Sequence, residues 1–318
     1  MRVVVTGGAG FIGAHTVRAL LQSGPVQSVA VVDDFSTGFA ANLDGIADVE
    51  VFEGSILEPA LLDRAFAGGD AVIHLAARPS VPRSLKDPLR THEVNASGTM
   101  QVLEAARRNG GLHAVVASSS SVYGSNPTLP KHEGLTPRPV SPYAASKLAT
   151  ESYALAHGAS FGLPVLAFRF FNVFGPFQPA GHAYAAVIPS FLSAALEGEP
   201  LTVHGDGKQS RDFTYVGSVA QLLTEAVLRR TTHHSPVNLA FGSRWTLLEV
   251  IELIEKIVGV PLAVRHTEPR AGDVPHSQAD STLLRSLFPN VEPVALAMGL
   301  ERTVDWFRAQ MAHGLSEG

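Results

Sequence analysis

The sequence of 318 residues contains no cysteine. A disulfide framework, a thiolate nucleophile and a cysteine-ligated metal are therefore excluded. Charged side chains make up only 17% of the chain, the formal net charge is −5 and no basic tract is present, so we expect no nucleic-acid partner. No apolar run reaches the ~18 residues that span a bilayer, and the opening residues 1–5 are too short for a signal-peptide core. We expect a cytoplasmic protein without membrane association.

Apolar residues, by contrast, make up 45% of the chain, enough for a large core. Short apolar runs alternate with longer segments of helical spacing, which predicts a parallel sheet covered by helices on both faces. The expected strands are residues 3–6, 29–32, 49–52, 71–75, 114–118 and 165–170, and the expected helices include residues 14–22, 94–108 and 143–157. Right-handed crossovers make this a doubly wound α/β fold of the Rossmann type.

The second half of the chain has shorter elements, interrupted by proline and glycine after residue 172. Residues 247–258, 281–287 and 300–310 have the spacing of helices. Because the chain is longer than a single core usually supports, we expect two lobes. Residues 1–171 form the doubly wound domain in this prediction. Residues 172–318 form a smaller C-terminal α/β lobe that binds the substrate, although segments can cross back.

A glycine-rich loop joins the first strand to the first helix, with Gly7, Gly10 and Gly13 in strand–loop–helix context. Glycines there permit a tight turn and a close approach of the backbone to a pyrophosphate, and the helix N-terminus offers free N–H groups. The next strand ends at Asp33, where a carboxylate can accept hydrogen bonds from an adenosine ribose. Asp33 would repel a 2′-phosphate, so the pattern predicts NAD rather than NADP as the cofactor.

A possible chemical centre is the pair Tyr143 and Lys147, four residues apart on a predicted helix and therefore on one face. An ammonium near a phenol lowers the phenol pKa, so the tyrosine can accept a proton near neutral pH. Alone, this spacing also fits an ordinary surface pair. A run of four serines, residues 118–121, ends a predicted strand, where ligands bind in open α/β sheets. No histidine spacing matches a metal site, so we expect no metal.

Motifs are spread over nearly the whole chain. They are residues 6–13, 72–77 (VIHLAA), Asn95, the serine run before residues 122–124, Tyr143 with Lys147, and residues 169–176, 205–213 and 270–273. This ordered set resembles the extended short-chain dehydrogenase/reductases, in particular the NAD-dependent nucleotide-sugar 4-epimerases. The resemblance implies an isomerase that inverts C4 of a UDP-sugar through a 4-keto intermediate, and a homodimer built on the helices of residues 94–108 and 143–157.

The resemblance also implies roles for individual residues. Ser119 would be the catalytic serine, with Ser120 as the alternative, Tyr143 the acid/base, and Lys147 the ligand of the nicotinamide ribose. The implied cofactor contacts are Gly7, Gly10, Phe11, Ile12, Gly13, Asp33, Asp34, Ser36, Thr37, Gly38, Ser55, Ile56, Leu75, Ala76, Ala77, Asn95, Tyr143 and Lys147. The implied substrate contacts are Arg78, Ser119, Ser120, Tyr143, Asn172, Val187, Arg211, Arg270, Asp273 and Ser277.

Three features that vary within the family bear on the reaction and its substrate. Ser55 stands where the family usually has an aspartate that holds the amino group of the adenine. Dehydration of the sugar is disfavoured, because family dehydratases resemble Thr-Asp-Glu where this chain has three serines, residues 119–121. Small Ser277 leaves room for a 2-acetamido group, so UDP-N-acetylhexosamines and UDP-hexoses should both fit.

A UDP-uronate is the rival substrate. Against it, uronate epimerases of the family tend to carry Thr in place of Asn172 and Arg in place of Pro179; for it, Arg78 or Arg83 could meet a C6 carboxylate. A ketone reductase and an NAD-binding regulator without catalytic activity remain further alternatives.

Overall fold

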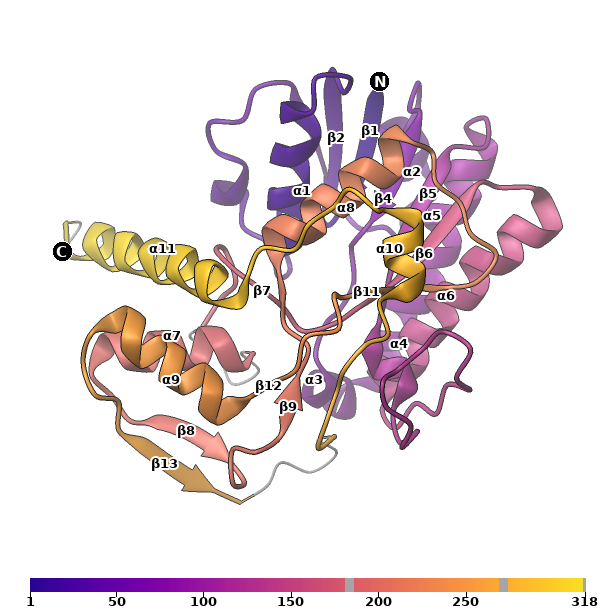
Figure 1. The fold of residues 1–318 in the computed structure, drawn as a ribbon. Helices are drawn as coiled ribbons and strands as arrows, with labels where there is room; N and C mark the ends of the chain where they lie inside the picture. Colours follow the sequence, from indigo (N-terminus) through magenta and orange to yellow (C-terminus); the bar gives the residue numbers. More distant parts are fainter. Residues whose placement is uncertain (181–185, 269–273, 317–318) are drawn as a thin grey trace.

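The computed structural model describes residues 1–180, 186–268 and 274–316, with side chains described to residue 312. Its centre is a seven-stranded parallel sheet in the order β11-β6-β5-β4-β1-β2-β3 (Figure 1). The strands are β1 (Arg2–Thr6), β2 (Ser28–Asp33), β3 (Val49–Glu53), β4 (Ala71–His74), β5 (His113–Ser119), β6 (Val165–Phe170) and β11 (Val237–Leu239). The order reverses between β1 and β4, which is the place where doubly wound folds bind their ligands.

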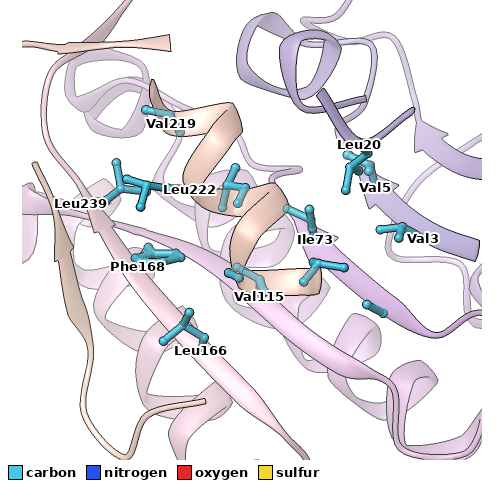
Figure 2. Packing of buried hydrophobic residues seen from close by; sticks show 14 of the residues in the cluster. Val3, Val5, Leu20, Ile73, Val115, Leu166, Phe168, Val219, Leu222 and Leu239 are labelled. Carbon is cyan, nitrogen blue, oxygen red and sulfur yellow. The ribbon is translucent and has the colours of Figure 1, made fainter. Parts of the chain in front are cut away.

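Successive strand residues face opposite layers, and both layers are apolar. On one face Val3, Val5 and Ile73 pack against α1 (Phe11–Gln22), α8 (Val216–Leu228) and α10 (Thr282–Leu287), as Figure 2 shows in part. On the other face Val4 and Val72 pack against the helices of the second layer. These helices are α2 (Pro59–Phe66), α5 (Gly98–Arg108) and α6 (Pro142–Phe161). Burial on both sides explains why the strands are continuous apolar runs.

The smaller lobe gathers short strand pairs and three helices at one end of the sheet (Figure 1). The helices α7 (Val187–Glu197), α9 (Leu247–Val258) and α11 (Leu296–Ser316) enclose their own apolar cluster, which includes Phe191, Ile254 and Leu300. The strand pairs are β7 (Val173–Phe174) with β10 (Thr214–Tyr215), β8 (Leu201–His204) with β13 (Val264–Thr267), and β9 (Ser210–Arg211) with β12 (Trp245–Thr246). Loops between these pairs and the large sheet border the cavities described below.

Five short helical segments complete the described elements: α3 (Val81–Lys86), α4 (Pro88–His92), η1 (Ala40–Leu43), the π-helical turn η2 (Glu93–Ser97) and η3 (Ser120–Tyr123). The predicted strands all form, with bounds shifted by at most one residue at either end, and the doubly wound fold is confirmed. The predicted helix over residues 94–108 begins as η2, and only α5 is regular. Among the described residues, no helix is long and apolar enough to cross a bilayer.

The chain crosses back after residue 172. Strand β11 pairs with β6 at the edge of the large sheet, and α8 packs against α1 on one of its faces. Both segments follow the expected boundary between residues 171 and 172. The division into a cofactor domain and a substrate lobe therefore stays a prediction, with β11 and α8 contributed to the sheet from the second half.

Candidate active site

The glycine-rich loop leaves β1 at the reversal of strand order. Gly7 has a φ of +73°, and a Cβ there would lie 2.7 Å from the backbone nitrogen of Ala76. A Cβ on Gly13 would lie only 2.0 Å from the carbonyl oxygen of Gly7, so both positions require glycine. Helix α1 starts at Phe11 with no side-chain cap and no acidic residue in its first turn. Its N-terminal N–H groups are thus available to a phosphate, as the sequence predicted.

Asp33 fixes the same loop from the end of β2. Its carboxylate accepts hydrogen bonds from the N–H groups of Ala9 and Phe35, each at 2.9 Å, and it is buried. Burial raises the pKa of this carboxyl, while the two N–H groups lower it. A carboxylate has about four lone-pair sites, so these bonds leave acceptors for a ribose diol. Buried Gly38 closes against the backbone of Ala9, where a Cβ would lie 2.9 Å away.

The other predicted cofactor contacts lie around this loop. Asp34, Ser36 and Thr37 are exposed after β2, and the Asp34 carboxylate accepts hydrogen bonds from Ser36. The Ser55 hydroxyl is used locally, since it accepts from the N–H of Leu57 at 3.2 Å. Ile56, another predicted contact, is buried. Leu75, Ala76 and Ala77 follow β4 and are partly buried. Their contacts with a cofactor stay predictions.

Asn95 braces the loop that follows β4. Its side-chain oxygen accepts from the N–H of Arg78 at 2.7 Å, and its amide donates to the Arg78 carbonyl at 3.2 Å and to the Ser146 hydroxyl at 2.9 Å. Asn95 lies in η2, and such π-turns are frequent at functional sites. With 1% exposure, Asn95 holds the loop after β4 through these bonds, and its contact with a cofactor stays a prediction. His74 is buried nearby, where its ring nitrogens are hydrogen-bonded to the hydroxyls of Thr6 and Thr99.

Tyr143 and Lys147 occupy the first two turns of α6, next to the end of β5. Helix α6 begins at Pro142 because Ser141 caps it, with its hydroxyl accepting from the N–H of Ala144. Burial raises the pKa of Tyr143, and a hydrogen-bonding interaction with the Ser119 side chain lowers it. The structure thus brings the predicted acid/base and the predicted serine together.

Lys147 contacts the strand next to its helix. Its ammonium donates a hydrogen bond to the carbonyl of Ala117 at 2.8 Å, and burial lowers its pKa to about 8. One of its N–H groups is thus directed at the backbone of β5, and the predicted effect of Lys147 on the phenol pKa stays a prediction.

A cleft of about 800 Å³ opens beyond these residues. Ser119 and Ser120 line it together with Asn172, Arg211 and Ser277. Apolar residues also line it, namely Val81, Leu85, Pro127, Leu129, Val140, Val274 and Pro275. None of the cleft-lining side chains among the described residues is Asp or Glu. Predicted substrate contacts that lie far apart in the sequence, the serines on the one hand and Asn172 and Arg211 on the other, thus line one cavity.

A smaller pocket of about 260 Å³ continues from it. Val187, a predicted substrate contact, lines this pocket. Thr202, His204, Gln209 and Phe213 line it too, and the sequence did not predict them. Asn172 and Arg211 line both cavities, so they stand at the junction. Asn172 has a φ of +34°, in the left-handed region that asparagine tolerates well, and its amide donates to the carbonyl of Asp212 at 3.0 Å.

The remaining predicted substrate contacts are placed less centrally. Arg78 forms an ion pair with Asp87 at 3.0 Å and lines neither of the two cavities described above. Arg270 and Asp273 lie outside the described residues. Tyr143 itself is not among the lining of the large cleft, although its neighbours Ser141 and Ala144 are.

Comparison with known proteins agrees with this geometry. The model of the NAD dependent epimerase/dehydratase family matches residues 3–240. The chain belongs to this family. It is 35% identical to the UDP-glucose 4-epimerase of Mycolicibacterium smegmatis, over 97% of this chain and 99% of that protein. It is also 35% identical to a dTDP-glucose 4,6-dehydratase of Streptomyces niveus, over 98% and 94% respectively.

The fold is also similar to a solved structure, with a TM-score of 0.90. That structure is the UDP-N-acetylglucosamine 4-epimerase of Methanobrevibacter ruminantium M1 in complex with UDP-N-acetylmuramic acid. Its identity to this chain is 37%, with 98% of this chain and 99% of that chain covered. The cofactor of the family is NAD, and the glycine loop, the free N-terminus of α1 and Asp33 fit it. The comparisons show the family, and they include both epimerases and dehydratases.

Proposed function

We propose that the protein is an isomerase that inverts C4 of a UDP-sugar. The glycine-rich loop, the N-terminus of α1 and Asp33 would hold NAD, which would supply the reversible hydride transfer at C4 that inversion requires. Tyr143 removes the proton of the C4 hydroxyl and later restores it, and Ser119 holds that hydroxyl and the phenol in line. Lys147 binds the nicotinamide ribose with the N–H bonds that Ala117 does not use, since an ammonium has three donors.

The observation that carries the choice of reaction is the absence of carboxylates from the described lining of the large cleft. Elimination of water across C5 and C6 requires an additional acid and base near those atoms. The residues at the corresponding place are Ser119, Ser120 and Ser121, whose hydroxyls have pKa values far above neutral pH and whose Ser119–Ser121 pair is hydrogen-bonded at 2.9 Å. Such a set can orient a sugar hydroxyl, but it is a poor acid/base pair for dehydration.

The junction between the two cavities supports a nucleoside diphosphate. A diphosphate linking a sugar in the large cleft to a nucleoside in the smaller pocket would pass between Asn172 and Arg211. A guanidinium can hold phosphate oxygens in a bidentate way, and an asparagine amide adds a neutral donor. This local positive charge is needed because the chain as a whole is acidic, with a formal net charge of −5.

A small residue at the sugar end favours a broad substrate class. Ser277 lines the large cleft. Its side chain leaves room for a 2-acetamido group, so we propose that both UDP-hexoses and UDP-N-acetylhexosamines are accepted. A cytoplasmic location remains part of the proposal.

A UDP-uronate is the second candidate, on the basis of Lys131 rather than Arg78. Lys131 lines the large cleft, is 7% exposed, and its ammonium bonds to the carbonyl oxygen of Asn126. Within the described part of the chain it has no carboxylate partner. A cation in that position could meet a C6 carboxylate, since buried charges are normally paired.

The experiment is a panel of UDP-glucose, UDP-N-acetylglucosamine and UDP-glucuronate with the purified protein, analysed by mass spectrometry and NMR. We expect products of unchanged mass with inverted C4 from the first two sugars. Loss of one water from the sugar would identify a dehydratase instead. A preference for UDP-glucuronate that disappears in Lys131→Met, while UDP-glucose turnover remains, would favour the second candidate.

A further inference from the structure

Successive turns of α6 face the end of β5. Tyr143, Lys147 and Glu151 are spaced four residues apart, so they lie on one side of the helix. Each of the three contacts one of residues 117–119 of β5. The first two members of this row belong to the proposed chemistry. The third, Glu151, lies one turn further into the protein, where it is 2% exposed and touches neither of the described cavities.

Glu151 binds the residue that immediately precedes the predicted catalytic serine. The hydroxyl of Ser118 lies 2.7 Å from one carboxylate oxygen of Glu151 and 3.1 Å from the carbonyl oxygen of Lys147. A single hydroxyl therefore touches both the side chain of Glu151 and the backbone of the turn that carries Lys147. This contact joins α6 to β5 at the turn that carries Lys147.

Arg169 from β6 holds the carboxylate in place. Its Nε donates to one oxygen of Glu151 at 3.0 Å and its Nη2 to the other at 2.6 Å, and both side chains are 3% exposed. The guanidinium also lies 4.7 Å from the ring centroid of Tyr123. Two parallel hydrogen bonds from a planar group set direction as well as distance. Because buried ion pairs contribute little net stability, geometry is the more direct explanation of this pair.

We propose that Glu151, held by Arg169, is a positioning residue for the Tyr143–Lys147 pair. Through Ser118 it sets the position of α6 against β5, and so aligns the phenol with the Ser119 hydroxyl. The inference rests on the proposed function, because the alignment matters when a proton moves between Tyr143 and the C4 hydroxyl.

The first variant is Ser118→Ala, which removes the link to β5 and leaves the ion pair intact. We expect kcat to fall by about 10-fold to 100-fold, the scale of a small misplacement of reacting groups, with KM and NAD affinity little changed. The acid limb of the kcat–pH profile should move to higher pH, because the phenol loses alignment with the hydroxyl that lowers its pKa. Ser118→Thr retains a hydroxyl and should restore both properties.

The second variant removes both charges together, as Glu151→Gln with Arg169→Met, so that no buried charge is left unpaired. It should reproduce the loss of kcat and the shifted profile. The control is Thr303→Ala, a buried hydroxyl of α11 that bonds to the carbonyl of Gly299. It should lower the melting temperature without moving the profile. If Ser118→Ala and the double variant behaved like this control, the positioning role would be overturned.

A measurement without sugar separates this inference from the proposed function. With NAD bound, the phenolate of Tyr143 can be titrated by ultraviolet difference spectroscopy, using Tyr143→Phe as the blank. We expect a higher Tyr143 pKa in Ser118→Ala than in the unchanged protein, and an equal pKa would overturn the inference. If the unchanged protein inverted no UDP-sugar, the proposed function would fail, and this titration would still decide the role of Glu151.

Discussion

The ammonium of Lys147 donates a hydrogen bond to the carbonyl oxygen of Ala117 at 2.8 Å. This bond joins the helix that carries the acid/base to the strand that carries the serine. It also directs the ammonium at the backbone, while burial raises the pKa of Tyr143 and the Ser119 side chain lowers it. The lysine therefore belongs to the framework of the candidate site, in addition to the cofactor contact that we propose for it.

Tyr143→Phe should keep the fold and NAD binding but lose epimerisation by about 10²–10⁴-fold, the usual scale for deleting a general acid/base. The matched control is Tyr123→Phe. Tyr123 is buried, and its hydroxyl donates to the side-chain oxygen of Asn238 at 2.6 Å. That variant should lose stability and retain most of its activity. Turnover and melting temperature of the two variants check this, and the reverse pattern would remove Tyr143 from the mechanism.

Wild-type protein should bind NAD more tightly than NADP, because the Asp33 carboxylate would repel a 2′-phosphate. Asp33→Asn retains an acceptor for the N–H of Ala9 but removes the negative charge. It should lower the ratio of the NADP dissociation constant to the NAD dissociation constant by about tenfold or more. Asp34→Asn, in an exposed neighbour, should change the ratio less. Calorimetry with both cofactors measures these ratios. Equal affinities in the wild type would contradict the assignment of Asp33 to the ribose.

Acidification should destabilise the protein partly through His74. Burial lowers the pKa of His74 from 6.5 to about 3, so the folded state resists a proton that the unfolded chain binds. The associated stability is present above pH 6.5 and is lost as the pH falls toward 3, at up to about 1.4 kcal/mol per pH unit. His74→Gln should show a flatter decline in the free energy of unfolding between about pH 6.5 and pH 4.5. The exposed His234→Gln should match wild type, and identical slopes in all three proteins would refute the prediction.

A homodimer is expected through the outer faces of α5 and α6. Met100 and Leu155 are partly buried there, and Tyr153 and Phe161 are exposed on α6 with 40% and 58% of their surface accessible. Leu148 of α6, by contrast, packs against an internal cluster. Sedimentation should show a dimer that Tyr153→Asp weakens.

The control for the dimer is Val260→Asp, which changes an exposed apolar residue beyond the end of α9. It should leave the association unchanged. A wild-type protein that sediments only as a monomer at micromolar concentration would contradict the dimer.

The first half of the fold was predictable because its strands are buried on both faces and its cofactor loop is a local pattern. Strand β11 was not predicted, since three residues are too few to show a period. The pairing of Arg169 with Glu151 is a contact between a strand and a helix, and the only local signal for it is the spacing of Glu151 four residues after Lys147. The meeting of the two cavities at Asn172 and Arg211 likewise depends on tertiary structure.

The central claim is that the C4 hydrogen leaves as a hydride and returns within one site. The most direct test is turnover of a UDP-sugar that carries deuterium at C4, in ordinary water, followed by NMR of the product. We predict that the product has inverted C4, unchanged mass and deuterium still at C4, because a hydride held on the bound cofactor does not exchange with solvent. Inversion with loss of the deuterium to water would show that C4 is deprotonated instead, and would contradict the account.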